Sequence, residues 1–407
     1  MSKISGESKN PLRRVKILDA SGVQLIEFGA HELQLEHLSY FFEGAKSLCI
    51  HYRHGRFGDS AGVNFSDHTL KHAKFYSLDK GFFSATLAFY IGILRSTSRQ
   101  DLVFISTGPE QKRWPDILFF ILLVLLHGNR LVLNIRRPEA WVRSSTSLRA
   151  ASCESTIRSL ALRGLKRVTC EGIGSKDFFR RFSGVENLLV SHIPTQFSDY
   201  VREKFQPHGD LAKNSPALNQ AGRLIKIGLL GGLDSKRRDY SIVAEALRLL
   251  STQMQQRITL VILGRSFGQE SDEIIRLLGR NATVELAPSQ FLTKEEFYSR
   301  GLSCDILLSP LRTGDGYGSA RGSGSYGDAL ALGKKLIIPK GVDPSGEYIN
   351  TSVTYLTASD LKDLFSSILN DSHVAELQSE HLVDFSRNSV IARVRKELNL
   401  LLHFGNQ

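Results

Sequence analysis

The sequence predicts an α/β protein made of two doubly wound, Rossmann-like domains that face each other across a cleft. Short apolar runs alternate with helical patterns in both halves of the 407-residue chain, which is typical of parallel sheets covered by helices. A polar stretch rich in Pro, Gly and Asn, residues 206–223, separates the halves and is typical of a linker. We therefore expect a first domain over residues 15–205, a second over 224–385, and a ligand between them.

The two ends of the chain lie outside these domains. Residues 1–14 are polar, and we expect a disordered tail there rather than a signal peptide, because no apolar segment follows them. Residues 386–407 include an amphipathic segment. We expect this segment to form a helix that packs back toward the first domain.

The first half contains apolar runs of strand length at irregular spacing, with helical patterns between them. The expected strands are residues 15–18, 47–52, 102–106, 130–135, 167–170 and 187–190, and the clearest expected helices are 82–94 and 117–126. Such an alternation predicts a parallel sheet with helices on its faces.

The second half shows the same alternation more regularly. Its expected strands are residues 224–230, 258–263, 283–286, 306–308 and 336–338, and its expected helices are 240–250, 272–278, 294–299 and 329–332. This is the order of a doubly wound domain of ordinary size.

The charge of the chain is less ordinary than its composition. Hydrophobic residues make up 42% and charged residues 23%, but the formal net charge is +11. Residues 130–181 contain twelve Lys or Arg against four Asp or Glu. A basic surface favours nucleic acid, anionic lipid or a phosphorylated substrate. No RNA-module motif or aromatic–basic interleaving is present, so nucleic acid is disfavoured, while an anionic membrane surface and a solvated face both remain open.

The cysteines and the apolar runs bear on compartment. Cys49, Cys153, Cys170 and Cys304 are widely spaced and lack metal-ligand pairing, which predicts reduced thiols in a cytoplasmic protein. The longest apolar run, residues 117–126, is too short to span a bilayer. It predicts a buried helix, with a helix lying on the inner face of the plasma membrane as the alternative.

The most informative stretch is residues 305–342, where a strand, a loop rich in Gly and Ser, a short helix and another strand follow one another. Glycines let a backbone approach a ligand, and the first turn of a helix offers free N–H groups to an anion. The predicted anion-binding residues here are Arg312, Ser323, Gly324 and Ser325. The alternative is an ordinary surface loop.

A second glycine-containing loop, residues 51–62, follows a predicted strand of the first half. Such loops lie at the carboxyl ends of strands, where open α/β sheets bind ligands. His54 and Asp59 are the catalytic candidates there, as a base or as contacts to an acceptor. For either residue alone, a place in an ordinary polar loop is an equal alternative.

Four segments of the second half, in order, resemble the nucleotide-sugar-binding domain of GT-B fold glycosyltransferases, namely the retaining glycosyl transferases group 1 superfamily. These segments are GLLGGLDSKRRDYSIVAEAL (228–247), LVILGRS (260–266), CDILLSPLRTG (304–314) and SYGDALALGKKLIIP (325–339). The first contains the glycine turn, Gly231 and Gly232. The resemblance covers residues 226–342, and the first half is similar to the family only in its alternation.

The resemblance implies roles for particular residues. Lys236 or Arg237 would meet the donor diphosphate, Arg265 would lie near the nucleotide, and Asp328 would occupy the place of the acid that holds the ribose. The family's other acid should lie eight residues before Asp328, where this chain has Ala320. This departure leaves open whether transfer retains or inverts configuration, and whether catalysis is kept.

The resemblance implies a glycosyltransferase that moves a sugar from a nucleotide-sugar donor to a polysaccharide or lipid-linked acceptor. No Asp-x-Asp or His cluster indicates a metal, and no other cofactor is expected. The alternatives are a nucleotide-sugar epimerase on the same fold and a non-catalytic partner that binds a nucleotide sugar or RNA. A dinucleotide oxidoreductase is disfavoured because the glycine turn lacks the G-x-G-x-x-G spacing.

Overall fold

The computed structural model describes part of the chain, and all structural statements below concern that part. The described residues are 22–28, 38–42, 45, 47–54, 71–77, 82–108, 114–136, 138–141, 161–170, 172–183, 189–192, 197–199, 201, 224–266, 268–287, 292–313, 323–343, 346, 348–370 and 383–403. The expected tail, the strand at 15–18, the linker at 206–223, and the residues Asp59 and Ala320 lie outside them.

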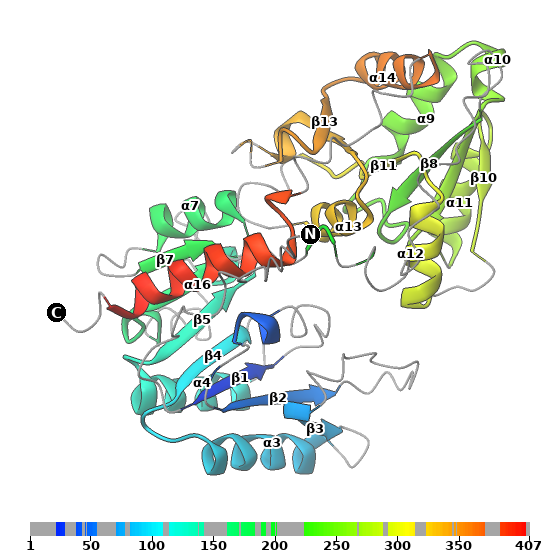
Figure 1. The fold of residues 1–407 in the computed structure, drawn as a ribbon. Helices are drawn as coiled ribbons and strands as arrows, with labels where there is room; N and C mark the ends of the chain where they lie inside the picture. The colour runs from blue at the N-terminus through cyan, green and yellow to red at the C-terminus, as the bar shows by residue number, and fades with distance from the viewer. Residues whose placement is uncertain are drawn as a thin grey trace, which may run out of the picture.

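The described residues form two separate sheets, and every strand pair in both sheets is parallel (Figure 1). The first sheet has the order β3-β2-β1-β4-β5-β6-β7 and the second the order β10-β9-β8-β11-β12-β13. Helices alternate with the strands in both halves, so the predicted fold class of two Rossmann-like domains is confirmed.

The first sheet and its helices come from the first half of the chain. Its strands are β1 (Val23–Glu27), β2 (Leu48–His54), β3 (Ala73–Ser77), β4 (Leu102–Thr107), β5 (Leu131–Ile135), β6 (Arg167–Cys170) and β7 (Leu189–His192). Its helices are α3 (Phe82–Ser96), α4 (Trp114–His127), α5 (Pro138–Trp141) and α7 (Ile173–Phe182).

The second sheet comes from the second half. Its strands are β8 (Ile225–Leu230), β9 (Ile258–Leu263), β10 (Thr283–Glu285), β11 (Ile306–Leu308), β12 (Leu336–Pro339) and β13 (Ser352–Tyr355). Its helices are α9 (Tyr240–Arg248), α10 (Thr252–Gln255), α11 (Gln269–Leu278), α12 (Lys294–Leu302), α13 (Gly324–Leu332) and α14 (Ala358–Asn370), with a 3-10 turn η4 (Lys340–Val342).

The last helix, α16 (Arg387–His403), returns to the first sheet and lies beside β7 (Figure 1). The Arg395 Nε atom donates to the carbonyl oxygen of Phe41 at 2.9 Å, and the backbone N–H of Arg387 donates to the carboxylate of Asp199 at 3.0 Å. The chain therefore enters the second domain once and leaves it to close on the first.

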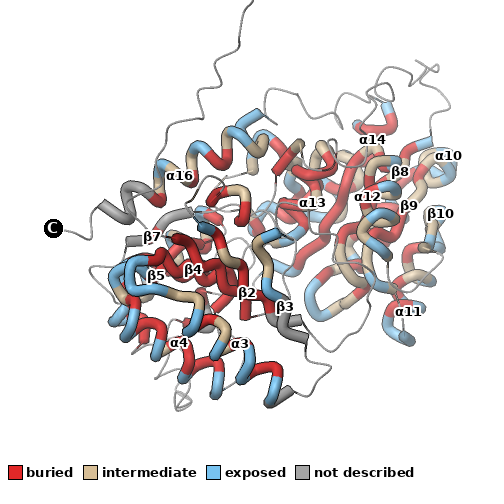
Figure 2. The backbone as a smooth tube through the Cα atoms, turned by 60° about the horizontal axis from the view of Figure 1, so that its bottom comes forward, coloured by how far each residue is buried: buried red, intermediate tan, exposed pale blue. Residues whose placement is uncertain are grey.

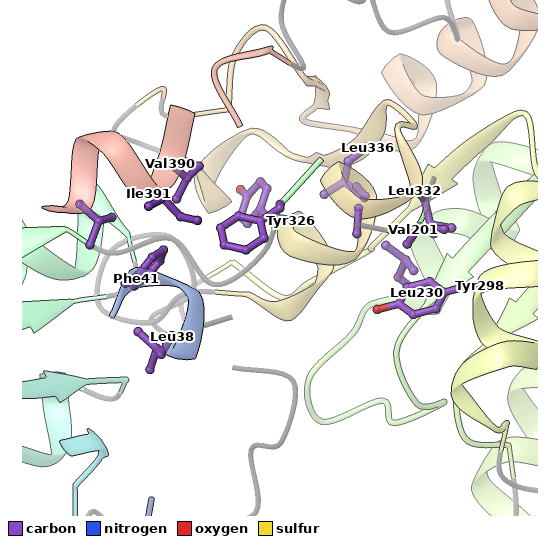
Figure 3. Packing of buried hydrophobic residues seen from close by; sticks show 14 of the residues in the cluster. Leu38, Phe41, Val201, Leu230, Tyr298, Tyr326, Leu332, Leu336, Val390 and Ile391 are labelled. Carbon is purple, nitrogen blue, oxygen red and sulfur yellow. The ribbon is translucent and has the colours of Figure 1, made fainter. Parts of the chain in front are cut away.

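The apolar interior has three parts. One cluster lies between the first sheet and helices α3 and α4, and another fills the second domain around α9 and α14. A third cluster runs from the opposite face of the first sheet, through α16, into the second domain. In Figure 3, Tyr326 of α13 lies between Val390 and Ile391 of α16 on one side and Leu336 on the other. Burial along this path ties the two domains together.

Helix α4 differs from the buried helix expected at 117–126. Buried and exposed positions alternate along it (Figure 2). Its inner side packs into the core through residues such as Phe120, but Leu118 and Leu125 on its outer side are exposed. Within the described residues, no helix is both long and apolar enough to cross a membrane.

Candidate functional site

Predicted ligand-binding residues gather at the carboxyl edge of the second sheet. The chain runs from β8 outward to β9 and β10, and then returns to the other side of β8 to form β11. The sheet therefore has a topological switch point between β8 and β11, which is where open α/β sheets bind ligands. Strands β8, β9 and β11 all end at this carboxyl edge, so the loops that follow them begin there.

The glycine turn after β8 is formed by close backbone contacts. Gly231 has a φ of 81°, and a Cβ atom there would lie 1.8 Å from a terminal nitrogen of Arg238. A Cβ atom on Gly264, after β9, would lie 2.0 Å from the Gly231 carbonyl oxygen. The backbone N–H of Leu233 donates to the Arg265 carbonyl oxygen at 2.9 Å. Only glycine fits at positions 231 and 264. The loop after β8 therefore packs directly against the loop after β9.

Arg238 is a site residue that the sequence did not single out. It is 6% exposed, and its Nη1 atom donates to the Gly232 carbonyl oxygen at 3.2 Å. Its Nε atom has no hydrogen-bond acceptor among the described groups. A buried, incompletely bonded guanidinium beside a glycine turn is a natural partner for an anion. The only sequence signal is its place as the last of three consecutive cations.

The two predicted diphosphate-binding cations, Lys236 and Arg237, lie on the turn before Arg238 and are exposed. The carboxylate of Asp234 accepts the backbone N–H of Lys236 at 2.9 Å, which fixes the turn. The turn thus presents two cationic side chains from a backbone that is held locally.

Glu270, at the start of α11, is an acid beside these cations that the sequence reasoning also missed. Its carboxylate accepts hydrogen bonds from the hydroxyl and the backbone N–H of Ser235, and these bonds lower the Glu270 pKa. The nearby Lys236 lowers the pKa further. The ionised carboxylate balances part of the positive charge of the turn.

Residues 234–238 are called the basic turn below. The segment after β11 joins this basic turn to helix α13. On one side, Arg312 Nε donates to the Ser235 carbonyl oxygen at 2.7 Å, and the Arg312 N–H donates to the Arg237 carbonyl oxygen at 3.0 Å. On the other side, the hydroxyls of Ser309 and Ser325 lie 2.9 Å apart. Residues 309–312 therefore contact both the basic turn and the start of α13, and keep these two segments close together.

Helix α13 begins with a formed cap. Ser323 is the N-cap, and its hydroxyl accepts the backbone N–H of Ser325 at 3.2 Å. Gly324 is exposed, and a Cβ atom there would meet nothing within 4 Å. Asp328 lies one turn further along and is half-buried. The start of the helix thus points its N–H groups and dipole toward the edge where the cations lie.

The two catalytic candidates, His54 and Asp59, belong to the first half of the chain. His54 ends β2 in the first sheet, and its side chain is outside the described part, as is all of Asp59. Within the described residues, no group of three or more His, Cys, Asp or Glu side chains is arranged to hold a metal ion. Because the side chains of His54 and Asp59 are outside the described part, neither is assigned as a catalytic base.

The first sheet has a buried polar row near its own carboxyl edge. Ser106 donates to the carboxylate of Glu27, Asn134 Nδ2 donates to the Ser106 carbonyl oxygen at 3.0 Å, and Thr169 donates to the Asn134 side-chain oxygen at 3.0 Å. Each of Glu27, Ser106, Asn134 and Thr169 is fully buried. The row crosses four adjacent strands and holds this edge of the sheet in place.

The comparisons with known proteins place the fold. No protein-family model matches the chain, and a search of curated proteins found no match. Among solved structures, the N-terminal domain of a Candida albicans trehalose-6-phosphate phosphatase is similar, with 13% identity and a TM-score of 0.64. The likeness covers 95% of this chain and 98% of that one.

Two further structures are similar over most of their length. A UDP-forming α,α-trehalose-phosphate synthase from Burkholderia vietnamiensis has 13% identity and a TM-score of 0.56, covering 94% of this chain and 99% of that one. An E. coli trehalose-6-phosphate protein bound with UDP-2-fluoro glucose has 12% identity and a TM-score of 0.53, covering 93% and 95%. At these identities the likeness is one of fold. The chain therefore has the two-domain GT-B fold that its second half resembles in sequence.

Proposed function

We propose that this chain is a glycosyltransferase that takes its sugar from a nucleotide-sugar donor and needs no metal ion. The observation that carries the proposal is the meeting of the basic turn, Arg312 and the start of α13 around residues 309–312. Nucleotide-sugar transfer needs cationic or N–H groups where the diphosphate leaves, because negative charge develops there. This edge of the sheet offers both.

The roles at the donor site follow from position. Lys236 and Arg237 face the diphosphate, together with Arg312 and the N–H groups of residues 323 and 324. The Gly231–Gly232 turn lets the nucleotide approach the backbone, with Arg265 beside it, and Asp328 holds the ribose. The buried Arg238 side chain donates to the Gly232 carbonyl oxygen of the turn and adds positive charge beside it.

The acceptor is proposed to be a growing polysaccharide or a lipid-linked glycan at the inner face of the plasma membrane. The basic stretch at 130–181 supports this, because a lipid diphosphate and the headgroups around it are anionic. The three similar structures are named for a trehalose phosphate, so a sugar phosphate is the competing acceptor.

The donor is tested with a thermal-shift panel of UDP-, GDP-, ADP- and TDP-sugars. A ligand that binds only the folded state raises the melting temperature by mass action, so one nucleotide should raise it in a dose-dependent way. If every sugar nucleotide in the panel leaves the melting temperature unchanged at millimolar concentration, the donor-site assignment is wrong.

Transfer is tested by following nucleotide diphosphate release with lipid-linked, polysaccharide and sugar-phosphate acceptors. Release that requires an acceptor supports the proposal, and the acceptor that gives it identifies the class. Conversion of the free nucleotide sugar without an acceptor identifies an epimerase instead. Donor binding with no turnover identifies a non-catalytic partner, in keeping with Ala320 where the family has an acid.

A further inference from the structure

Helices α3 and α4 lie side by side on one face of the first sheet. The rings of Tyr90 and Phe119 stack with centroids 4.2 Å apart, and the Tyr90 hydroxyl donates to the Asp116 carboxylate at 2.6 Å. The inner sides of both helices are buried, through Phe89 and Phe120 among others. The outer sides of the two helices, whose exposed positions are pale blue in Figure 2, together make up what we call the α3–α4 face.

The α3–α4 face is apolar to an unusual degree. All exposed residues of α4 are apolar, and most exposed residues of α3 are apolar as well. Leu125 is 78% exposed and Leu118 is 59% exposed. The apolar exposed residues are Leu87, Ala88, Ile91 and Leu94 on α3, and Trp114, Pro115, Leu118, Leu122, Leu125 and Leu126 on α4. Large exposed apolar patches of this kind mark interaction sites.

Among the described residues, the exposed charges around this face all have one sign. Arg95, Arg99 and Arg130 are exposed at the ends of the two helices and in the turns after them. The two acids there, Asp101 and Asp116, are buried and accept hydrogen bonds from Gln24 and Tyr90. The described part of this face, with its turns at 97–101 and 128–130, exposes no carboxylate.

We propose that the α3–α4 face docks this chain on a lipid bilayer that contains anionic lipid. The leucines and Trp114 enter the boundary of the acyl chains, and the arginines bind headgroup phosphates. A bilayer fits better than a protein partner because the face offers almost no polar side chain to set a protein register, while its cations match an anionic surface.

The docked orientation deepens the proposed function, and rests on it only for the choice of a lipid-linked acceptor. Each helix follows a strand of a parallel sheet, so α3 and α4 both begin at the carboxyl edge of the first sheet. Trp114 at the start of α4 therefore lies at the edge where an acceptor is expected. Docking brings that edge to the membrane.

The test is co-sedimentation of the full chain with vesicles of phosphatidylcholine, alone or with about 30% phosphatidylglycerol. We expect binding to the mixed vesicles and much weaker binding to phosphatidylcholine alone. The variant L118E/L125E should bind the mixed vesicles at least about tenfold more weakly, because it places two negative charges in the apolar α3–α4 face. The variant R95A/R99A should lose the preference for anionic lipid.

The control variant is I349E/L356E, which changes two equally exposed apolar residues of the second domain, 72% and 69% exposed. It should bind vesicles as the wild type does. Equal vesicle binding by the wild type and L118E/L125E would overturn the proposal. So would a wild-type dimer that L118E/L125E dissociates, because the face would then join two copies.

The vesicle test is separate from the donor-site test. L118E/L125E should keep the thermal shift given by the nucleotide sugar, which also shows that the variant is folded. Vesicle binding without any nucleotide-sugar binding would leave the docking surface standing and remove the proposed function. Nucleotide-sugar binding without vesicle binding would remove the docking surface and leave the proposed function standing.

Discussion

At the scale of single residues, the candidate site depends on positions where a side chain must be absent and positions where a charge must be present. Gly231 is of the first kind, because its φ is positive and Arg238 occupies the space of a Cβ atom. In the proposed donor site, Lys236 and Arg237 are of the second kind. The pattern of glycines predicted the turn, but burial of Arg238 beneath it depends on packing that no local pattern encodes.

The first residue-scale prediction concerns Gly231. Gly231→Ala should lower the free energy of unfolding by about 1–3 kcal/mol, because alanine is strained at this φ and displaces the Arg238 guanidinium. Chemical denaturation followed by circular dichroism measures this. Gly324→Ala is the matched control, since a Cβ atom there meets nothing. Equal stabilities for the two variants would contradict the close contact.

The second residue-scale prediction concerns the proposed contacts of Lys236 and Arg237 with a diphosphate. Lys236→Ala with Arg237→Ala should weaken nucleotide-sugar binding about tenfold or more, since charge-assisted bonds to phosphate are lost. Titration calorimetry with the nucleotide found by the thermal-shift panel measures the dissociation constant.

The control for this pair is Arg276→Ala with Arg280→Ala, which removes the same charge at the far end of α11. It should leave the dissociation constant within about twofold, because exposed charges at that distance are screened by salt. If both pairs weaken binding equally, net charge is responsible and the diphosphate assignment is wrong.

At the scale of elements, buried polar side chains decide where the first strands lie. Gln24 of β1 donates to Asp101 at 3.0 Å, and its side-chain oxygen and Ser96 both lie within hydrogen-bond distance of His51 on β2. Strand β1 is central, yet its Gln24 and Glu27 made it hard to predict from an apolar run. Their partners lie far away in the sequence, so only the folded chain shows that these polar groups are satisfied.

The element-scale prediction is a loss of stability in acid caused by His51. Burial, and then the charge of Lys74, lower the His51 pKa from 6.5 to about 4. In the unfolded chain the His51 ring binds a proton near pH 6.5, whereas in the folded chain it does so only near pH 4. The free energy of unfolding therefore falls as the pH drops from 6.5 to about 4. The contribution is roughly 2–3 kcal/mol at the acid end of this range.

Urea unfolding at pH 7 and pH 4.5, followed by tryptophan fluorescence, measures this loss. Both tryptophans, Trp114 and Trp141, belong to the first domain, so the signal reports the domain that holds His51. His51→Gln keeps a hydrogen-bonding side chain without a titrating ring, and its acid loss should be smaller. A wild-type loss no larger than that of His51→Gln would show that other groups cause it.

At the scale of the whole molecule, α16 makes the first domain depend on the last residues of the chain. Its apolar side, including Val394 and Leu398, is buried in the cluster that also contains Phe41 and Tyr326. Arg387 lies over the ring of Tyr40 at 5.1 Å from its centroid. The amphipathic pattern at the end of the sequence predicted a helix, but its place beside β7 is a matter of tertiary contacts.

The whole-molecule prediction follows from this crossing. Leu398→Ala should destabilise the first domain by about 2–4 kcal/mol, because it empties a site that is 1% exposed. The shift should appear in the urea transition seen by tryptophan fluorescence, although the change is near the end of the chain. Val383→Ala, at a residue that is 59% exposed, should change stability by less than about 0.5 kcal/mol.

The sequence by itself determined the features whose causes are local. Alternating apolar runs and helical patterns determined two parallel α/β units, and glycines and serines at strand ends determined where the backbone turns. These are properties of a few consecutive residues, so they can be predicted from spacing alone.

Only the tertiary structure decided which distant residues meet. It placed Arg312 against Ser235, buried Arg238 and Gln24 with their partners, and left one side of α4 uncovered where a buried helix was expected. The physical reason is that burial and hydrogen bonding depend on neighbours from other elements, and those neighbours are set by how the two sheets and α16 pack together.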